Sequence, residues 1–207
     1  YIDVLALSNQ KDVDYLRSKW FKTSYTVQST CDTNFYRKLN DCETKFDIVF
    51  IGNNFCDTNS NYECTTERLS MYNTLREQYH DTFRCFGRNW LNSKIVGIND
   101  ELQIYNSCKI AINHNNFDRE LYTSDRLWRG MACGAFMLTK YFKGIETIFE
   151  SGVHLDWWQT TDELKEKIDY YLEHDEERER IRLAGFEMVK SKCIYTDRLK
   201  QMFGIIS

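Results

Sequence analysis

The chain has 207 residues, of which 42% are hydrophobic and 15% aromatic, and it carries a formal net charge of −4. This apolar content is enough for a packed core and excludes wholesale disorder. The negative charge argues against a protein that binds nucleic acid mainly through phosphate contacts. No segment approaches the ~18 consecutive apolar residues of a membrane-spanning helix, so we expect no membrane span.

The cysteines favour a reducing compartment. The chain has eight of them, and they form no CxxC pair, which argues against a zinc site. Several lie in predicted strands or helices, where cysteine behaves as a small buried hydrophobe. Residues 1–8 lack the basic flank and the length of a signal peptide. We therefore expect a cytoplasmic protein without disulfides; the alternative is a bridge between Cys56 and Cys64, which share a loop.

The first forty residues predict a small unit of their own. Residues 1–8 are β-branched and aliphatic and predict a strand, and residues 23–28 predict a second one. Between them, residues 12–20 place apolar side chains at helical spacing. Residues 31–40 are polar and irregular, so we expect them to connect two domains.

The middle of the chain alternates strands and helices. Residues 46–54 form the clearest buried strand, because the run is apolar on both faces apart from Asp47 and ends in the turn signal Gly52-Asn53-Asn54. The elements expected next are a helix from Thr65 or Thr66 to Tyr79, a strand at 82–87, a short helix at 101–107 and a strand at 108–113.

Residues 122–139 predict a helix followed by a strand. Ser124 and Asp125 are suited to the N-cap and the first turn. Gly134 ends the helix, where a positive φ is usually needed, and residues 135–138 are long enough for a buried strand. The elements expected after this stretch are a short helix at 142–150, an edge strand at 153–158, a capping box at 160–163 that starts a helix, a helix from Asp175 and a final helix at 195–203.

This alternation predicts an α/β fold, a Rossmann-like parallel sheet with helices on both faces. Three strands end in glycine or asparagine, at Gly52–Asn54, Gly87 and Asn113–Asn115, and the helix from Ser124 opens on the same edge. In such sheets ligands bind outside the carboxyl ends of the strands, and a helix N-terminus binds phosphate. The alternative is an ordinary helix-to-strand connection without a ligand.

A series of motifs follows in register between residues 46 and 203. Its members are 47–53 (DIVFIGN), 109–113 (KIAIN), 124–128 (SDRLW), 131–139 (MACGAFMLT), 144–146 (GIE) with Phe149 and Gly152, 163–172 (ELKEKIDYYL), 178–185, and Tyr195 with Arg198. The series resembles the C-terminal, donor-binding domain of GT-B glycosyltransferases, and most of all the group related to spore-maturation glycosyltransferases (glycosyl transferases group 1-like). The resemblance implies a nucleotide-sugar-binding domain at residues 41–207, preceded at 1–40 by a remnant of the N-terminal domain and the interdomain crossover.

Two positions depart from the family pattern. The family glutamate that usually holds the donor's ribose hydroxyls is Arg129 here, and the histidine of the terminal motif is Cys193. An arginine cannot accept hydrogen bonds, but it pairs with phosphate or carboxylate. Either donor recognition differs in this protein or binding has been lost; we favour altered recognition, because the surrounding motif is kept.

The resemblance implies transfer of a sugar from a UDP- or GDP-linked donor to an unknown acceptor, with no cofactor and no bound metal. Backbone N–H groups at Gly52, Asn53 and Asn54 would approach the donor, and the helix N-terminus at Ser124 would face its diphosphate. Arg126 or Arg129 would neutralise the departing nucleotide; the alternative for Arg126 is a structural ion pair. Further donor-site candidates are Arg88 for phosphate, His114 for the sugar, Glu146 for sugar hydroxyls, and Asn113 and Gly134 at the adjoining turns.

The length of the chain limits what the resemblance implies. A complete enzyme of this type needs two domains of about 150 residues or more, with catalysis in the cleft between them. The chain is therefore either truncated or completed by a partner chain or a homodimer. No catalytic base can be named. A non-catalytic nucleotide-sugar-binding module and a purely structural domain are the other function classes left open.

Overall fold

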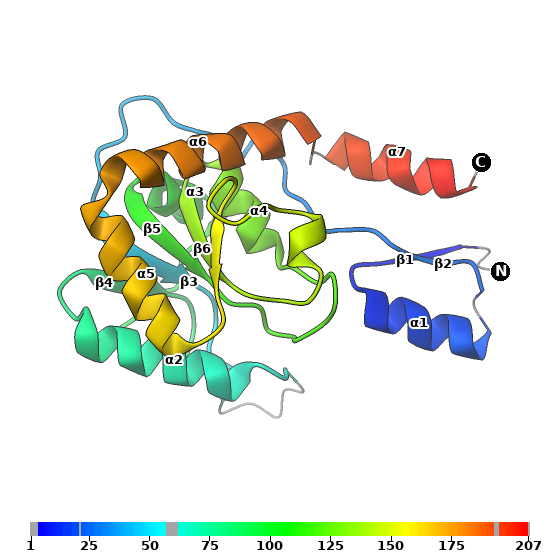
Figure 1. The fold of residues 1–207 in the computed structure, drawn as a ribbon, viewed down its shortest axis with the longest axis horizontal. Coiled ribbons are helices and arrows are strands. Elements are labelled where there is room, and N and C mark those ends of the chain that lie inside the picture. Colours follow the sequence, from blue (N-terminus) through cyan, green and yellow to red (C-terminus); the bar gives the residue numbers. More distant parts are fainter. Residues whose placement is uncertain (1–3, 21, 57–61, 193–194, 207) are drawn as a thin grey trace.

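A five-stranded sheet with the order β4-β3-β5-β6-β7 forms the centre of the protein (Figure 1). The structure is a computed structural model that describes residues 4–20, 22–56, 62–192 and 195–206. Each pair of neighbouring strands is parallel. The prediction of a Rossmann-like parallel sheet is therefore confirmed. The strands are β3 (Phe46–Ile51), β4 (Phe83–Phe86), β5 (Cys108–Asn113), β6 (Phe136–Lys140) and β7 (Asp156–Trp158).

Helices cover both faces of this sheet. Successive strand residues point to opposite faces, and here both sets are apolar, so each face needs a helical layer to bury it. Ile48 and Phe50 pack with α2 (Thr65–Gln78) and α5 (Thr161–Glu173). Val49 and Ile51 pack on the other side with α3 (Ile98–Asn106) and α4 (Asp125–Ala132), and the end of α6 (Asp175–Lys192) joins that cluster through Val189. None of the described helices has the length and apolar character needed to cross a bilayer.

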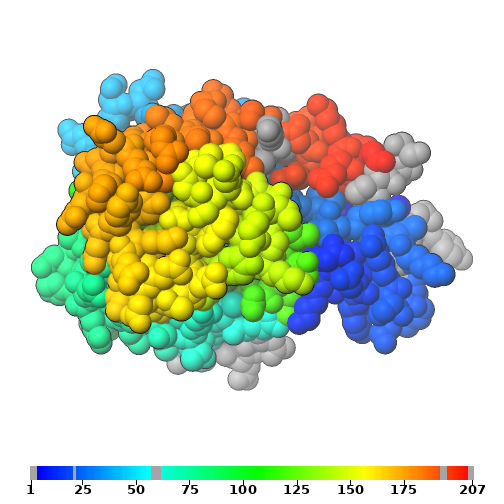
Figure 2. Space-filling model, in the orientation of Figure 1, coloured from blue at the N-terminus to red at the C-terminus, as the bar shows by residue number. Residues whose placement is uncertain are grey.

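The N-terminal residues form a small unit beside the main sheet. Strands β1 (Leu5–Leu7) and β2 (Ser24–Thr26) pair in parallel, and α1 (Gln10–Lys19) connects them; residues 1–3 of the predicted first strand lie outside the described ranges. The unit is attached to the loop before α4, where the Gln10 N–H donates to the Glu120 carbonyl at 3.0 Å. In Figures 1 and 2, α7 (Tyr195–Ile206) extends from α6 toward this end of the molecule.

The segment that joins β2 to β3 is irregular, as predicted, but it is packed. Cys31 and Tyr36 are buried in the core cluster of α3 and α4. The Leu39 N–H donates to Asn106 Oδ1 at 2.7 Å. These contacts fix the segment to α3, and the division of the chain near residue 40 stays a prediction.

The predicted helix over residues 142–150 is wrong. Only a 3₁₀ turn, η1 (Ile145–Thr147), forms there, because Gly144 has a φ of +90° and interrupts the backbone before a helix can develop. Gly152 then turns the chain at a φ of +70°, and its N–H donates to the Leu155 carbonyl at 2.9 Å. This turn also shortens the predicted strand over residues 153–158 to β7, which is an edge strand as expected.

Other predicted boundaries shift by small amounts. Helix α3 begins three residues before Glu101, since the Gly97 N–H donates to the Asp100 carboxylate at 3.1 Å and starts the helix there. At α5, Thr160 Oγ1 accepts from the Glu163 N–H as a capping box requires, but the Glu163 carboxylate accepts from the Gln159 N–H instead of from Thr160. Cys64 is a buried free thiol, so the alternative bridge to Cys56 is not formed. Cys193 lies outside the described residues.

Two helical glycines give a matched test of this packing. A Cβ at Gly185 in α6 would lie 2.1 Å from the His154 carbonyl oxygen, whereas a Cβ at Gly204 in α7 would meet no heavy atom within 4 Å. Alanine normally stabilises a helix by ~1 kcal/mol relative to glycine. We expect Gly185→Ala to lower the free energy of unfolding by about 1–3 kcal/mol, because the backbone at His154 or in α6 must move to admit the added methyl group. Gly204→Ala is expected to be neutral or stabilising. Equal effects in chemical denaturation would contradict this account.

Candidate functional site

The carboxyl end of β5 holds the start of α4 in place. Asn113 Nδ2 donates to Thr139 Oγ1 at 2.8 Å, and Asn113 Oδ1 accepts from the Ser124 hydroxyl at 3.1 Å. Ser124 is the N-cap residue, as predicted, but its hydroxyl binds Asn113 and no side chain caps the helix. The Leu127 N–H donates to the Ser124 carbonyl at 3.2 Å, so the N–H groups of Asp125 and Arg126 are those that stay available at the carboxyl edge of the sheet.

The turns after β3 and β4 are bonded to one another. Asn53 Oδ1 accepts from the Arg88 N–H at 2.8 Å, and the Asn54 N–H donates to the Arg88 carbonyl at 2.9 Å. The Trp90 indole donates to the Gly52 carbonyl at 2.6 Å. The structure thus brings the predicted residues Gly52, Asn53, Asn54 and Arg88 together. The bonds they make fix the two turns, and the Arg88 side chain is exposed.

Arg68, in the first turn of α2, is a buried cation that pairs with no carboxylate of the described residues. The residue is 2% exposed, and its guanidinium lies over the Phe50 ring, 5.4 Å from the centroid. Its Nε and Nη2 atoms are buried without a hydrogen-bond partner. Burial, followed by the positive charge of Arg126, lowers the pKa of Arg68 to about 9. The end of β3 accommodates the guanidinium, since a Cβ at Gly52 would lie 2.6 Å from Arg68 Nη2.

Arg126, in the first turn of α4, carries a second guanidinium whose positive charge acts on Arg68. Its Nη2 atom is also buried without a partner. Among the described residues, no carboxylate forms an ion pair with Arg68 or Arg126. Two like charges with unused donors are costly to keep buried. Because guanidinium groups and helix N-termini both bind phosphate oxygens, this arrangement is suited to a phosphate or diphosphate. The arginine pair Arg68 and Arg126 is called the phosphate seat below.

Arg129, the departure from the family pattern, is engaged by protein groups. Its Nη1 lies 3.0 Å from Glu101 Oε2, and its Nη2 pairs with Asp125. The guanidinium also covers the Tyr36 ring at 5.2 Å, and the Tyr36 hydroxyl donates to the same Glu101 oxygen at 2.7 Å. A donor phosphate at Arg129 would have to displace these partners.

A second charged cluster lies next to the phosphate seat. Lys140 Nζ, at the end of β6, donates to Glu67 Oε1 at 2.5 Å. The other carboxylate oxygen, Glu67 Oε2, lies 3.5 Å from His114 Nε2, and that nitrogen is buried without a hydrogen-bond partner. Burial lowers the pKa of His114 below its usual value, although Glu67 acts in the opposite direction.

Two predicted site residues lie elsewhere. Gly134 has the expected positive φ, +72°, but it follows the C-terminal end of α4, where its carbonyl accepts from Arg182 Nη1 at 2.6 Å. It therefore belongs to the opposite end of the helix from the phosphate seat. Glu146 lies exposed in η1, beyond the end of β6, and its hydrogen bond raises the pKa of Tyr141.

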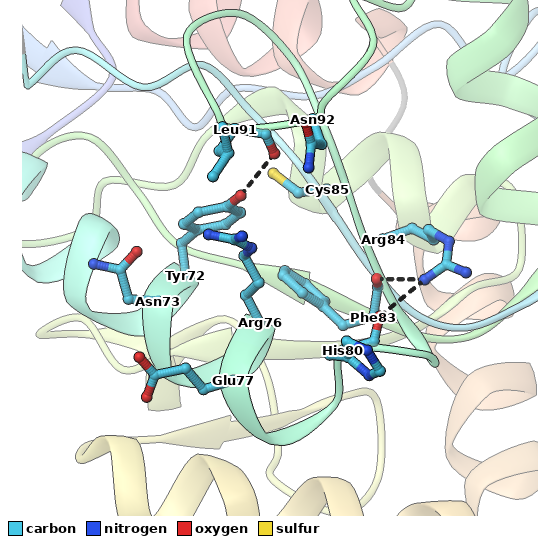
Figure 3. Close-up of a pocket in the computed structure, with 10 residues that line it drawn as sticks. All are labelled: Tyr72, Asn73, Arg76, Glu77, His80, Phe83, Arg84, Cys85, Leu91 and Asn92. Atoms are coloured by element: carbon cyan, nitrogen blue, oxygen red, sulfur yellow. Dashed lines mark hydrogen bonds between the residues drawn. The ribbon is translucent and has the colours of Figure 1, made fainter.

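A cavity of about 710 Å³ lies along the outer edge of β4 (Figure 3). The Tyr72 hydroxyl closes one side by donating to the Leu91 carbonyl at 2.9 Å. Arg84 folds back onto the carbonyls of Phe83 and His80, at 2.9 and 3.4 Å. None of the residues that line this cavity has a buried polar side-chain atom without a partner. The cavity lacks the unsatisfied charge of the carboxyl edge, so we assign the site to that edge.

Sequence reasoning missed Arg68, Glu67 and Lys140. Arg68 carries one usable signal, because a cation in the first turn of a helix opposes the helix dipole and requires another reason for its position. Glu67 and Lys140 are 73 positions apart, and their pairing at 2.5 Å arises from the fold alone.

Known proteins similar to the chain were found at the family level and at the level of structure. The sequence model of the family described as "Glycosyl transferase-like" matches residues 68–204. Among curated proteins, none matches the sequence.

Several solved GT-B glycosyltransferase structures share the fold. Alr3699/HepE from Anabaena, solved with UDP and glucose, is 10% identical with a TM-score of 0.73, over 100% of this chain and 63% of its own. Sucrose-phosphate synthase from Thermosynechococcus elongatus is 10% identical with a TM-score of 0.70, and the similarity covers 100% of this chain and 58% of the synthase chain. The C-terminal domain of LpcC, a glycosyl transferase group 1 family protein from Francisella tularensis, is 13% identical with a TM-score of 0.58. The similarity covers 80% of this chain and 99% of that domain. The chain thus spans under two thirds of the first two.

The buried His114 gives a test of the second cluster that needs no ligand. Its pKa is lowered in the folded protein, so below pH 6.5 the unfolded chain binds a proton that the native state resists. The free energy of unfolding should then fall with falling pH, by up to about 1.4 kcal/mol per unit for this group. Urea denaturation at pH 7.5, 6.5 and 5.5 should show a shallower decline in His114→Gln. Parallel declines would show that His114 protonates freely in the native state.

Proposed function

The chain belongs to the glycosyl transferase-like family, and from this premise we propose that it binds a nucleotide sugar and serves as the donor-binding half of a glycosyltransferase. The observation that carries the proposal is the phosphate seat, where Arg68 and Arg126 keep buried guanidinium atoms without partners. Solved relatives of the same fold hold UDP or UDP-glucose. A nucleoside diphosphate supplies the charge that the two arginines lack.

The proposed chemistry uses the phosphate seat to stabilise the leaving group. When the bond between the sugar's anomeric carbon and the diphosphate breaks, the bonding electrons stay on the phosphate oxygen and its negative charge grows. Donors already held toward that oxygen stabilise this charge without reorganising during the reaction. Arg68, Arg126 and the N–H groups at the start of α4 are such donors. The acceptor and the group that activates it stay unassigned.

We further propose that this chemistry is independent of a metal ion, since two fixed cations supply the charge that a divalent ion would otherwise provide. The chain has an Asp-x-Asp triplet at residues 12–14. It lies in α1, where the Asp12 carboxylate accepts from Asn9 Nδ2 at 2.9 Å and the Asp14 carboxylate accepts from Gln10 Nε2 at 2.7 Å. One oxygen of each carboxylate thus accepts a local bond at the start of the helix.

Within the family, we propose the group related to spore-maturation glycosyltransferases, with a UDP- or GDP-linked donor; the support is the series of motifs between residues 46 and 203. The acceptor side of the cleft would come from a further N-terminal domain, a partner chain or a second copy. The fraction of the relatives that the chain spans, 63% and 58% for the first two, supports this division.

A second candidate function is a non-catalytic nucleotide-sugar-binding module. Arg129 favours it, because it occupies the position of the family's ribose-binding glutamate and is held by Glu101 and Asp125. Hydrolysis of the donor separates the two functions. An enzyme should release free sugar from its donor slowly in water, whereas a binding module should hold the donor intact.

The buried cation gives a paired prediction for binding and stability. We expect Arg68→Met to weaken binding of UDP or GDP by about 10–100-fold, the equivalent of about 1.5–3 kcal/mol for a charged hydrogen bond. The same substitution removes an unpaired buried charge, so the free energy of unfolding should rise by about 1 kcal/mol. Titration calorimetry and chemical denaturation measure the two effects.

Arg76→Met is the matched control, since Arg76 is an exposed arginine of the same helix. It should change neither diphosphate affinity nor stability appreciably. If Arg68→Met lost stability while keeping its affinity for the diphosphate, Arg68 would be a structural residue and the phosphate seat would be disproved.

A further inference from the structure

Asp125 places a negative charge beside groups that are proposed to bind phosphate. It is the first residue of α4, and its N–H and that of Arg126 are the donors that stay available at the start of this helix. A carboxylate in the first turn stabilises a helix through the helix dipole, but it repels an anion that the same turn binds. A phosphate held by the Asp125 N–H would lie close to that residue's own carboxylate. The site therefore needs a cation that neutralises Asp125.

The charge of Asp125 acts in the same region as the charges of the phosphate seat. Burial raises the pKa of the Tyr122 hydroxyl in the loop before α4; Arg126 and Arg68 oppose this shift, and Asp125 reinforces it. All three charges therefore reach the same hydroxyl. Among the described residues, no ion pair joins Asp125 to either arginine of the phosphate seat. Asp125 is thus close enough to influence the phosphate seat without blocking it.

Arg129 supplies the cation that Asp125 needs. Its Nη2 pairs with the Asp125 carboxylate one helical turn earlier, and its Nη1 lies 3.0 Å from Glu101 Oε2 in α3. The guanidinium lies 5.2 Å from the centroid of the Tyr36 ring, and the Tyr36 hydroxyl donates to the same Glu101 oxygen. Glu101 and Tyr36 are both buried. A guanidinium that is held by two carboxylates and a buried ring has little freedom to turn away, so Arg129 is fixed on Asp125.

The loss of Arg129 would change the charge that an anion meets. Arg126 is the residue next to Asp125, and its Nη2 has no hydrogen-bond partner, so it is available to pair with a freed carboxylate. That pair would use the donor that a phosphate requires. The three arginines Arg68, Arg126 and Arg129 outnumber the carboxylates Asp125 and Glu101. Without Arg129 the numbers are equal, and this excess of positive charge, which attracts an anion, is lost.

We propose that Arg129 is a positioning residue for diphosphate binding: it neutralises Asp125 and thereby leaves Arg126 and the N–H groups of the first turn of α4 free for the phosphate. The inference rests on the proposed function, because it requires an anion at the phosphate seat. It gives Arg129 a role in binding without contact with the ligand. It also explains how a helix that begins with a carboxylate serves an anion.

A double-mutant cycle on the whole chain tests this role, with the affinity for UDP and GDP measured by calorimetry and folding checked by urea denaturation. The variants are Arg129→Met, Asp125→Asn, the two together, and Arg129→Lys. Where Arg129→Met fails to fold, the same cycle is run with Glu101→Gln, which removes the buried carboxylate that would otherwise lose its cation. Arg182→Met is the matched control, because Arg182 also pairs with a carboxylate one turn earlier, that of Glu179, and lies at the other end of α4.

We expect Arg129→Met to weaken diphosphate binding by about tenfold or more, because the freed carboxylate repels the phosphate and pairs with Arg126. In this background Asp125→Asn should restore the affinity to within about threefold of the wild type; on its own it should change the affinity by less than about twofold, because Arg129 already neutralises the carboxylate. Arg129→Lys keeps the charge and should stay within about threefold of the wild type. The control should stay within about twofold, whatever its stability.

The rescue by Asp125→Asn separates this role from the alternatives. A loss of affinity that Asp125→Asn fails to restore would mean that Arg129 contacts the ligand or supports the fold, and it would overturn the proposal. Unchanged affinity in Arg129→Met, or an equal loss in the control, would overturn it as well. Absent binding of UDP and GDP by the wild type would remove the proposed function together with this inference, whereas wild-type binding without rescue would remove this inference alone.

Discussion

The constraint on which this site depends is the buried Arg68, which, like the half-buried Arg126, has no ion-pair partner among the described residues. Arg68 is 2% exposed, and Arg126, whose charge acts on it, also has a guanidinium nitrogen without a partner. A core of this size could replace a buried cation with an apolar side chain at a gain in stability. We therefore interpret the unpaired arginines as a ligand-binding feature that the protein keeps at a cost in stability. Two residues of β3 and its turn accommodate the Arg68 guanidinium: Gly52 has no Cβ that would collide with it, and the Phe50 ring lies against it.

The fold explains how the arginines come together. A parallel sheet gathers the carboxyl ends of its strands at one edge, and the helices that follow β3 and β5 begin there. Asn113 anchors the start of α4 to the ends of β5 and β6, so Arg126 is positioned by a hydrogen-bonded chain that runs through Ser124 and Thr139. The N-terminal unit is bonded to the loop that precedes α4.

The sequence predicts those features of the fold that depend on local pattern. Strand β5 occupies the predicted residues 108–113, and Ser124 is the N-cap of α4, because apolar runs and capping residues act within a few positions. The helix over residues 142–150 fails, since its apolar spacing is helical but Gly144 adopts a positive φ. Arg68 and the pairing of Glu67 with Lys140 were not predicted, because burial and long-range contact determine their roles.

A crystal structure of the chain with a nucleoside diphosphate, UDP or GDP, would test the central claim most directly. We expect the phosphate oxygens to lie within hydrogen-bond distance of Arg68 and Arg126, with the first turn of α4 donating to the same group. Density for the diphosphate along the outer edge of β4, in the cavity of Figure 3, would contradict the account. So would a complex in which the guanidinium of Arg68 remains without a ligand contact.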